Sequence, residues 1–563
     1  VAAEHYDLVA VDVEVEPTRD LAHGDYTTNV ALKVASRWGV APRQASGTIL
    51  TDLLKSKVLL KLCSKMEVAG PGFINFYIKP EVLLKEFVDT SDSKLFKGKK
   101  IIVEYSSPNI AKPMHVGHIR STIIGAALAN LYESLGAKVI RLNHLGDWGT
   151  QFGKLIAAYK LWGSKSAVHK NPIEEMLKLY VRFHEEIKEN PDLEARGQEE
   201  FKKLEQGDQE NRKLWEWFRI ESLREFDKLY KRLGAKFNYL TGESFYESML
   251  PGVVADLTKR KIARKNDDGS VVVHLVEESL PPMLVQKSDG ASLYATRDLA
   301  TIRYRVQHFK PKEIIYVVAN QQALHFEQLF ATAERAGYAP GVNLEHVKFG
   351  LVLGEDGQKM ATREGKIIKL EEVLDKAVTL ARQIVEQKNP RLTAKVKSHV
   401  AEVVGIGAVK YNDLSQNRNT DIAFHWEKML AVDGNSGPYL QYTYVRLKSI
   451  LRKALASGKG KSKKSVPHAP VSLTAATPPD LTLLRLLSRY SEARLRAVHE
   501  KGPHLLAGYI YELAEQVNSF YHSSPVLTAG AELKALRLHL ISHAAEVLKD
   551  GLAILGIGVV EEM

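Results

Sequence analysis

Two histidines stand three residues apart in His115-Val116-Gly117-His118, directly before a stretch with helical periodicity. A helix N-terminus presents unpaired N–H groups and the positive end of the helix dipole, so it attracts phosphate. Two imidazoles on this turn can donate hydrogen bonds to phosphate oxygens, while Gly117 leaves room for a flat base beside the backbone. Lys112, three residues upstream, can add a positive charge. The segment indicates a nucleotide-phosphate site, although two surface histidines near a helix cap would produce the same pattern.

A second cationic segment lies far downstream, between Gly354 and Gly365. Polar residues between two glycines predict a loop that follows a strand, and Lys359 and Arg363 place two cations on it. Cations on a loop suit a leaving pyrophosphate, because negative charge develops there only as the bond breaks. An ordinary surface turn is the alternative. The common GxxxxGK[ST], GxGxxG and HExxH motifs are absent from the sequence.

The elements around the two histidines predict a β-α-β unit. The apolar run Ile101-Ile102-Val103 predicts a strand, and residues 138–143 predict a second strand. Between them, residues 116–135 predict a helix with Ile119, Ile123, Ala127 and Leu131 on one face. This order implies a parallel sheet covered by helices. Further strands are expected at residues 271–275, 314–319 and 347–352, with the charged helical stretch 171–234 as an insertion.

The two ends of the chain have different patterns. Near the N-terminus, a helical pattern over residues 28–38 and an alternating stretch over 66–78, broken at Gly70-Pro71-Gly72, predict a small α+β module. From Leu370 onward, long amphipathic segments predict helices without strands. Residues 457–479 predict an exposed linker, whose lysines either contact phosphates or are simply solvated.

The length and composition limit the number of domains and the classes of protein that fit this chain. The 563 residues suggest about three or four domains, and 78 Lys and Arg against 67 Asp and Glu give 78 − 67 = +11. Nucleic acid is therefore a candidate partner, although many basic proteins bind none. Cys63 is the single cysteine, which excludes disulfide frameworks and thiolate zinc sites. Neither a run of 18 apolar residues nor a signal-peptide pattern is present, so we expect a soluble, cytoplasmic protein.

Longer blocks of sequence carry a resemblance to a known family. His115–His118 and the stretch KMATR from Lys359 are similar to the HIGH and KMSKS signatures of class I aminoacyl-tRNA synthetases. The chain most closely resembles the arginyl-tRNA synthetases, through EYSSPNIAKPMHVGHIRST at 104–122, NHLGDWGTQFG at 143–153, LYATRD at 293–298, Gln321-Gln322 with His325, and LAILGI at 552–557. The resemblance covers essentially the whole chain.

This resemblance implies an α/β multidomain fold in three parts. They are an α+β domain that contacts the tRNA elbow (1–95), a Rossmann-like parallel-sheet catalytic domain with a helical insertion near 171–270 (96–385), and an all-α anticodon-binding domain (386–563). The implied activity is that of an arginine–tRNA ligase. It activates L-arginine with ATP, releases pyrophosphate, and transfers the arginyl group to the 3′ end of tRNA(Arg), with tRNA needed for activation. Mg²⁺ on the ATP phosphates, no structural zinc or other metal site, no membrane partner and a monomeric state are also implied.

The resemblance assigns roles residue by residue. The resemblance implies that the catalytic residues are Lys112, His115, His118 and Lys359. It implies that the residues in contact with ATP are His115, Gly117, His118, His144, Gly146, His325 and Lys359. Arginine contacts fall to Glu104, Ser106, Asn109, His118, Tyr294, Asp298 and Gln322, because a guanidinium needs carboxylates and polar neighbours. tRNA contacts fall to Phe73, Asn75, Tyr439, Tyr442 and Met563, since splayed bases stack on aromatic rings.

Several alternatives stay open at this point. Asp298 taken alone fits an acid on a helix surface, and Phe73 fits the core of a strand. The KMSKS signature has a second lysine that is missing here, and the resemblance implies that Lys112 compensates for it. A non-catalytic tRNA-binding relative of the synthetases and a different HxGH nucleotidylyltransferase are the competing functions.

Overall fold

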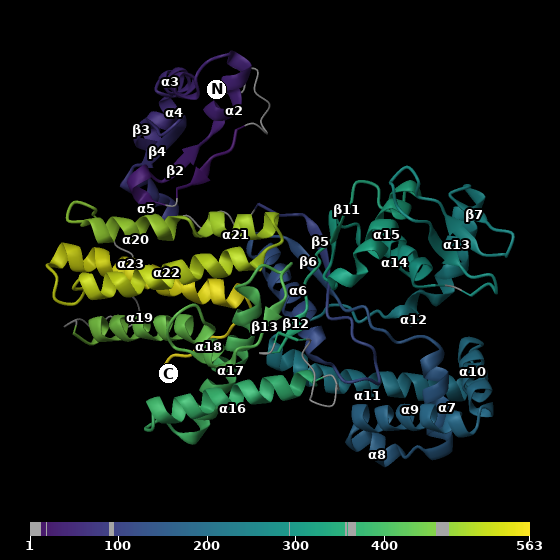
Figure 1. Ribbon diagram of the computed structural model, residues 1–563. Coiled ribbons are helices and arrows are strands. Elements are labelled where there is room, and N and C mark those ends of the chain that lie inside the picture. The colour runs from purple at the N-terminus through teal and green to yellow at the C-terminus, as the bar shows by residue number, and fades with distance from the viewer. Residues whose placement is uncertain are drawn as a thin grey trace. The chain divides into compact units, whose positions relative to one another are not determined.

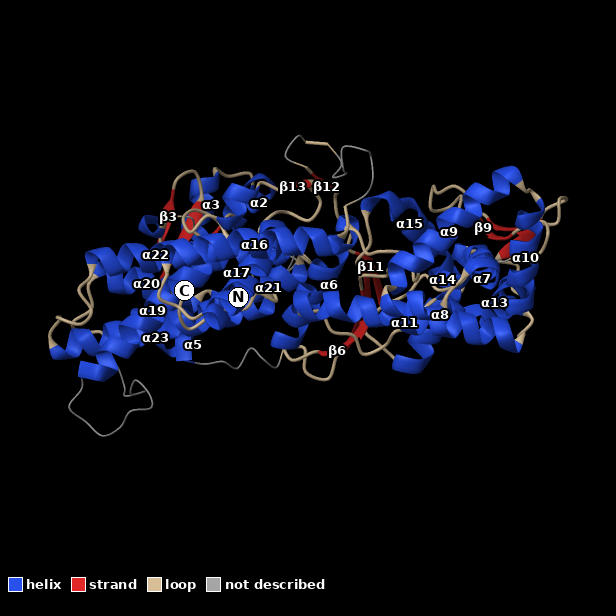
Figure 2. Ribbon diagram, turned by 90° about the horizontal axis from the view of Figure 1, so that it is seen from below, coloured by secondary structure: helices blue, strands red, loops and turns tan. Residues whose placement is uncertain are grey.

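The computed structural model describes residues 13–18, 20–88, 95–291, 293–354, 357–358, 368–457 and 472–563. The chain divides into two compact units. Unit 1 comprises Val1–Asp92, Arg446–Ala493 and Tyr511–Leu548, and unit 2 comprises Ser93–Val445, Arg494–Ile510 and Lys549–Met563. Figures 1 and 2 show their helices and strands.

Unit 1 begins with the predicted α+β module. Its antiparallel sheet has the order β1-β2-β4-β3 and is formed by β1 (Glu16–Pro17), β2 (Tyr26–Thr28), β3 (Cys63–Ala69) and β4 (Phe73–Ile78). Its helices are α2 (Val30–Trp38), α3 (Pro42–Leu53), α4 (Lys57–Leu62) and α5 (Pro80–Val88). Ile74 and Phe76 of β4 enter a core with Val30 and Val34 of α2. The predicted helix and strand pair are confirmed.

The central sheet of unit 2 is parallel, as predicted. Its order is β11-β10-β5-β6, from β5 (Lys100–Glu104), β6 (Lys138–Leu142), β10 (Glu313–Tyr316) and β11 (Asn343–His346). Helix α6 (Val116–Ser134) connects β5 to β6 and completes the β-α-β unit. Ile101, Ile102 and Val103 are at most 1% exposed, because a parallel strand is covered on both faces.

Helix α6 differs from the sequence prediction in one respect. It is buried on nearly all sides, and its polar residues Arg120, Ser121 and Thr122 are enclosed together with the apolar ones. Arg120 forms an ion pair with Asp413 at 3.1 Å, and the Ser121 hydroxyl donates to the Val317 carbonyl at 2.7 Å. The predicted face with Ile119, Ile123, Ala127 and Leu131 is buried, and partners inside the fold satisfy the polar side chains that are enclosed with it.

The insertion into the catalytic part is helical and begins earlier than residue 171. It contains α7 (Thr150–Trp162), α8 (Lys165–Lys170), α9 (Pro172–Glu189), α10 (Asp192–Glu205) and α11 (Gln209–Leu233). Figure 1 shows these helices gathered at the lower right. They are followed by α12 (Glu243–Tyr246), α13 (Leu250–Lys259), α14 (Tyr294–Phe309) and α15 (Ala323–Arg335).

Three strand predictions need correction. The strand expected at 271–275 is β8 (Val271–Val273), which belongs to a separate antiparallel sheet with β7 (Ala263–Lys265) and β9 (Met283–Gln286). The strand expected at 347–352 is replaced by β11, whose polar residues at a sheet edge hid it from an apolar pattern. A short parallel pair of β12 (Val352–Leu353) and β13 (Ile422–Ala423) places a strand after residue 370, where we expected none.

The C-terminal part is helical, as predicted. Its helices are α16 (Leu370–Lys388), α17 (Ala394–Leu414), α18 (Trp426–Leu430), α19 (Gly437–Ser457), α20 (Pro478–Ser488), α21 (Tyr490–His499), α22 (Pro503–Ser523) and α23 (Ala531–Ile554). Most of the predicted linker at 457–479 lies outside the described residues. Within the described part of the chain, no helix combines the length and the apolar character needed to cross a bilayer.

Gly125 tests how closely α6 packs on the sheet. A Cβ at this position would lie 2.2 Å from the Cβ of Tyr105, a residue that is 0% exposed. Gly125→Ala should therefore destabilise the protein by about 1–3 kcal/mol through overpacking, measured as a lower melting temperature. Gly252→Ala is the matched control, since nothing lies within 4 Å of a Cβ on this helical glycine. Equal melting temperatures for the two variants would contradict this account.

Candidate active site

The predicted histidine turn caps the N-terminus of α6. His115 is the N-cap residue, and its Nδ1 accepts a hydrogen bond from the Gly117 N–H at 3.1 Å. The His118 Nδ1 accepts from the His115 N–H, also at 3.1 Å, and the two ring centroids are 3.9 Å apart. Because both Nδ1 atoms act as acceptors, each neutral ring carries its proton on Nε2. The turn therefore presents two neighbouring imidazole N–H groups.

His118 is neutral at physiological pH. Burial, together with the neighbouring His115, lowers the pKa of His118 to about 3. Gly117 is required for this geometry, because a Cβ there would lie 2.8 Å from Cε1 of the His115 ring. The turn can thus donate hydrogen bonds to an anion without carrying a full positive charge on His118.

The loop after β5 has a strained backbone that side chains hold in place. Ser106, Ser107 and Ala111 have positive φ angles of 76°, 47° and 61°. The Ser106 N–H donates to the Ser121 hydroxyl at 2.9 Å, and the Ser107 N–H donates to Asn143 Oδ1 at 3.0 Å. Backbone strain of this kind persists only where the surroundings enforce it, and it is frequent at functional sites.

The loops after β5 and β6 are joined through Gly146. The Gly146 N–H donates to the Pro108 carbonyl, and the Ile110 N–H donates to the Gly146 carbonyl, both at 3.1 Å. A Cβ on Gly146 would lie 1.8 Å from Oδ1 of Asn109, so a glycine is needed for this approach. The structure therefore brings together the two motif blocks at 104–122 and 143–153.

Predicted arginine-binding and ATP-binding residues share one region at the carboxyl end of the sheet. Glu104, at the end of β5, is 6% exposed and lies 2.5 Å from Nη1 of Arg305. Asp298 on α14 lies 2.7 Å from Nε2 of His325 on α15. Burial lowers the pKa of His144, and the charges of Glu104 and Asp298 oppose that shift. These three groups are thus close enough to interact electrostatically.

Three of the other predicted arginine ligands are more exposed than Glu104. Tyr294, the first residue of α14 and one turn before Asp298, is 67% exposed. Asn109 and Gln322 are exposed, whereas Ser106 is buried. The ammonium of Lys112 lies 5.5 Å from the ring centroid of Tyr180, so it faces the helical insertion.

The segment after the predicted pyrophosphate loop is hydrogen-bonded to the residues beside the histidine turn. Lys359 and Arg363 lie outside the described residues. Beyond them, the Val116 N–H donates to the Ile368 carbonyl at 3.1 Å, and the Leu370 N–H donates to the Met114 carbonyl at 2.9 Å. The segment that follows the loop is therefore fixed on both sides of His115.

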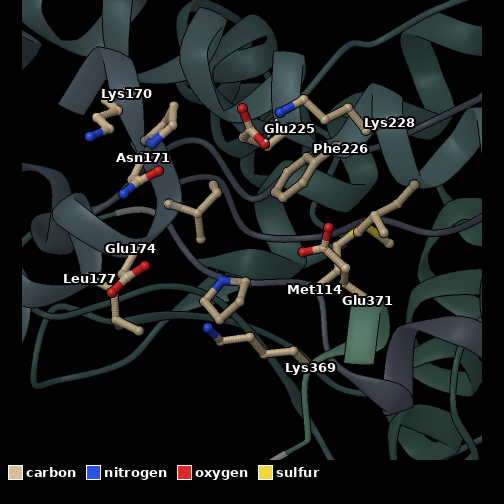
Figure 3. Close-up of a pocket in the computed structure, with 14 residues that line it drawn as sticks. Met114, Lys170, Asn171, Glu174, Leu177, Glu225, Phe226, Lys228, Lys369 and Glu371 are labelled. Atoms are coloured by element: carbon tan, nitrogen blue, oxygen red, sulfur yellow. Dashed lines mark hydrogen bonds and ion pairs between the residues drawn. The ribbon is translucent and has the colours of Figure 1, made fainter. Parts of the chain in front are cut away.

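A cavity of about 250 Å³ lies beside this junction. Its walls come from the segment before His115, the helical insertion and the segment that follows the predicted pyrophosphate loop. Figure 3 shows the charged side chains at the cavity, which are Lys170, Glu174, Glu225, Lys228, Lys369 and Glu371. None of the predicted ATP or arginine ligands lines it.

The predicted elbow-binding residues share one face of β4. Ile74 and Phe76 point into the core, so Phe73 and Asn75 lie on the opposite face. Phe73 is half-buried and is not a member of that core. Asn75 is 3% exposed, and its Oδ1 accepts a hydrogen bond from the Thr27 hydroxyl at 2.7 Å. On this face, Phe73 is therefore more accessible to a ligand than Asn75.

The predicted anticodon-binding residues lie near the chain end within unit 2. Tyr442 on α19 is 38% exposed, and Tyr439, one turn earlier, is half-buried. Gln441 on the same helix donates to the Gly558 carbonyl at 2.7 Å, which holds the C-terminal segment against α19. Met563, five residues further on, is half-buried.

Sequence reasoning missed three residues that build the site. Asn143 and Tyr230 hold the loop after β5, and Arg305 holds Glu104. Tyr230 lies within the charged helix α11 and Arg305 within α14, where a single polar residue has no distinguishing pattern. Asn143 had a usable signal, because it is the last residue of a predicted strand.

Family models match the chain in three consecutive ranges. Residues 2–78 match the arginyl tRNA synthetase N terminal domain, residues 80–426 match the catalytic domain of class I (R) tRNA synthetases, and residues 440–563 match the DALR anticodon binding domain. The arginine–tRNA ligase of Fusobacterium nucleatum is 40% identical over 555 residues, which cover 98% of this chain and 95% of that relative. The Clostridioides difficile arginine–tRNA ligase is also 40% identical, with the same coverage.

The chain belongs to the arginyl-tRNA synthetase family. Its fold agrees with solved arginyl-tRNA synthetases. The Plasmodium falciparum structure gives a TM-score of 0.83 at 28% identity, covering 100% of this chain and 97% of that one. The Thermus thermophilus structure gives a TM-score of 0.83 at 26% identity, covering 98% of this chain and 96% of that one. An arginyl-tRNA synthetase is an arginine–tRNA ligase, which confirms the predicted fold, family and activity.

The Tyr230 hydroxyl links the helical insertion of this synthetase to the active-site loops. Asn143 uses its Oδ1 to accept from Ser107, so its Nδ2 donates to the Tyr230 oxygen at 3.0 Å. Burial raises the pKa of Tyr230 to about 12, and its proton is therefore available to the Ser106 hydroxyl at 2.8 Å.

Tyr230→Phe leaves two buried polar groups short of a partner, at a cost of about 1–3 kcal/mol. We expect kcat/KM for arginine to fall about tenfold, measured by pyrophosphate exchange. Tyr159→Phe is the control, because the Tyr159 hydroxyl makes no hydrogen bond to the described residues. An unchanged kcat/KM in Tyr230→Phe would show that the loops hold their shape without this hydroxyl.

Proposed function

We propose that this arginyl-tRNA synthetase carries out both of its reaction steps at the histidine turn and the loops bonded to it. In the first step, the carboxylate of arginine attacks the α-phosphorus of ATP in line, and pyrophosphate leaves. In the second step, the terminal ribose hydroxyl of tRNA(Arg) takes the arginyl group, and AMP leaves. The observation that carries this proposal is the pair of imidazoles, 3.9 Å apart, at the N-terminus of α6.

In this proposal the protein activates ATP by positioning it and stabilising charge. His115 and His118 donate from Nε2 to phosphate oxygens, and Gly117 and Gly146 let the nucleotide approach the backbone. His144 and His325 lie near the nucleotide. Lys359 stabilises the leaving pyrophosphate, and Lys112 supplies the charge that the missing second lysine of the KMSKS signature would give.

Mg²⁺ in this proposal arrives with ATP. The two carboxylates proposed to bind arginine are already paired, Glu104 with Arg305 and Asp298 with His325, which does not suit a protein-held cation. Phosphate and water oxygens would hold the Mg²⁺ and neutralise phosphate charge. No structural zinc is proposed.

The arginine pocket in this proposal uses the two carboxylates separately. Glu104, with the polar groups of Ser106, Asn109 and His118, holds the α-amino and carboxylate end of the substrate. Asp298 meets the guanidinium, assisted by Tyr294 and Gln322. The separation suits arginine, whose two cationic groups stand at opposite ends of the molecule.

The tRNA contacts complete the proposal. Phe73 and Asn75 contact the tRNA elbow, while Tyr439, Tyr442 and Met563 contact the anticodon. The three proposed parts are residues 1–95, 96–385 and 386–563. The matched family models also follow one another in three ranges, at 2–78, 80–426 and 440–563. Helices α16 and α17 belong to unit 2, so we propose that they connect the last two parts. We further propose a cytoplasmic monomer.

Arginine-dependent ATP–pyrophosphate exchange, measured with and without tRNA(Arg), tests the proposed function. We expect exchange with arginine and tRNA(Arg), and none with lysine or ornithine under the same conditions. Exchange in neither condition would reject the proposed chemistry, and exchange with another amino acid alone would correct the substrate.

The pH dependence of exchange tests the state of His118. A group with a pKa of about 3 stays neutral throughout the range from pH 6 to 9, and it gains a proton only far below that range. His118→Asn should therefore lower kcat about 100-fold by removing a donor, while the midpoint of the acid limb of the profile stays where it is. A shift of that midpoint in the variant would show that His118 titrates during the reaction.

A further inference from the structure

Arg305 is a fully enclosed cation that the reaction described above does not use. Its side chain reaches from α14 to the carboxyl end of β5 and is 0% exposed. Nη1 lies 2.5 Å from Oε2 of Glu104, while the rings of Tyr246 and Tyr316 lie 6.0 Å and 5.7 Å from the guanidinium carbon. Among the described residues, Glu104 is the one acidic partner within ion-pair distance of Arg305.

The stability of the fold does not account for this pair. Removing two charges from water costs several kcal/mol per ion, and apolar replacements of similar volume are often as stable or more so. The guanidinium also makes no well-directed hydrogen bond to the described residues, so its nitrogens gain little beyond the charge contact. A function at Glu104 explains the pair better than stability does.

The surroundings of Glu104 would otherwise disfavour a negative charge. Asp298 and Asp147 are both close enough to act on His144, the same ring that Glu104 acts on. Burial lowers the pKa of His144, so this ring is neutral and adds no compensating charge. Burial raises the pKa of Tyr316, so its hydroxyl keeps its proton. Arg305 is therefore the cation in direct contact with Glu104, and its positive charge offsets the nearby carboxylates.

The pair also decides which oxygen of Glu104 can meet a ligand. Arg305 occupies Oε2, which leaves Oε1 for a substrate. Asp298 is arranged in the same way, because His325 occupies Oδ2 and leaves Oδ1. Each carboxylate thus offers one oxygen from a fixed direction, which suits single contacts to two separate cationic groups better than one bidentate contact.

We propose that Arg305 is a positioning residue for arginine binding: it holds Glu104 in place through Oε2, so that Oε1 receives the α-ammonium of the substrate. The inference rests on the proposed role of Glu104. It assigns to Arg305 an effect on the affinity for arginine, with little effect on ATP binding or on the chemical step.

Pyrophosphate exchange by Arg305→Met in the full chain tests the proposal. The variant should raise KM for arginine at least tenfold, change kcat less than threefold, and leave KM for ATP unchanged. Arg305→Lys keeps a positive charge near Glu104. Its increase in log KM for arginine should therefore be at most half of the increase in Arg305→Met. Calorimetric titration of arginine into each variant, without ATP, should give the same order of Kd values.

A double-mutant cycle separates positioning from a general loss of structure. Once Glu104→Gln has removed the charge, adding Arg305→Met should raise KM for arginine by less than threefold, because the target of Arg305 is gone. Arg537→Met is the matched control. Arg537 is 5% exposed and pairs at 3.0 Å with Asp480 in unit 1, so its loss should lower the melting temperature without changing KM for arginine.

Three results would overturn the proposal. They are an unchanged KM for arginine in Arg305→Met, fully additive effects of Glu104→Gln and Arg305→Met, and parallel increases in KM for ATP. If Arg305→Met does not fold, the comparison of Arg305→Lys with Glu104→Gln still decides, because a positioning role requires both to raise KM for arginine selectively. Failure of wild-type exchange would instead reject the proposed function and leave the calorimetric comparison to judge Arg305.

Discussion

The active-site region depends on two backbone hydrogen bonds at Gly146. They join the loops that leave two neighbouring parallel strands, β5 and β6, at their carboxyl ends. The loop after β5 could not keep its shape alone, because Ser106 and Ser107 have unfavourable positive φ angles. The strain is tolerated since Ser121, Asn143 and Tyr230 supply hydrogen bonds from three other elements. Rigid positioning suits a reaction in which the substrates carry the reacting groups.

Electrostatics at the site follow from the same arrangement. The chain is basic overall, yet the groups that would bind arginine are carboxylates, of which Glu104 is buried and Asp298 is half-buried. Each of these carboxylates has an internal basic neighbour, Arg305 for Glu104 and His325 for Asp298. The two imidazoles at the start of α6 share their turn without like-charge repulsion, because His118 is neutral. The charge of Glu104 is therefore balanced locally by Arg305, which limits the cost of desolvating this part of the site when substrates enter.

Much of the fold and part of the site could be predicted from the sequence. The β-α-β unit was predictable because Ile101-Ile102-Val103 is buried on both faces and α6 is long and largely apolar. Strand β11 was not, because its residues are polar and lie at a sheet edge. The histidine turn was visible as a local motif. Tyr230 and Arg305 were not visible, since their importance comes from tertiary contacts across more than 120 and 200 residues of sequence.

The hydrogen bonds beside His115 add a constraint on how the site can close. Met114 and Val116 bind the backbone of the segment that follows the predicted pyrophosphate loop, through Leu370 and Ile368. The end of that loop is therefore fixed to the residues that flank His115. A shift of this segment would pull on the cap of α6, where bonds to Nδ1 hold the two imidazoles that we propose as donors to phosphate. The histidine turn and the described segment that begins at Ile368, more than 240 residues apart in sequence, thus share one backbone junction, so a displacement of either one acts on the other.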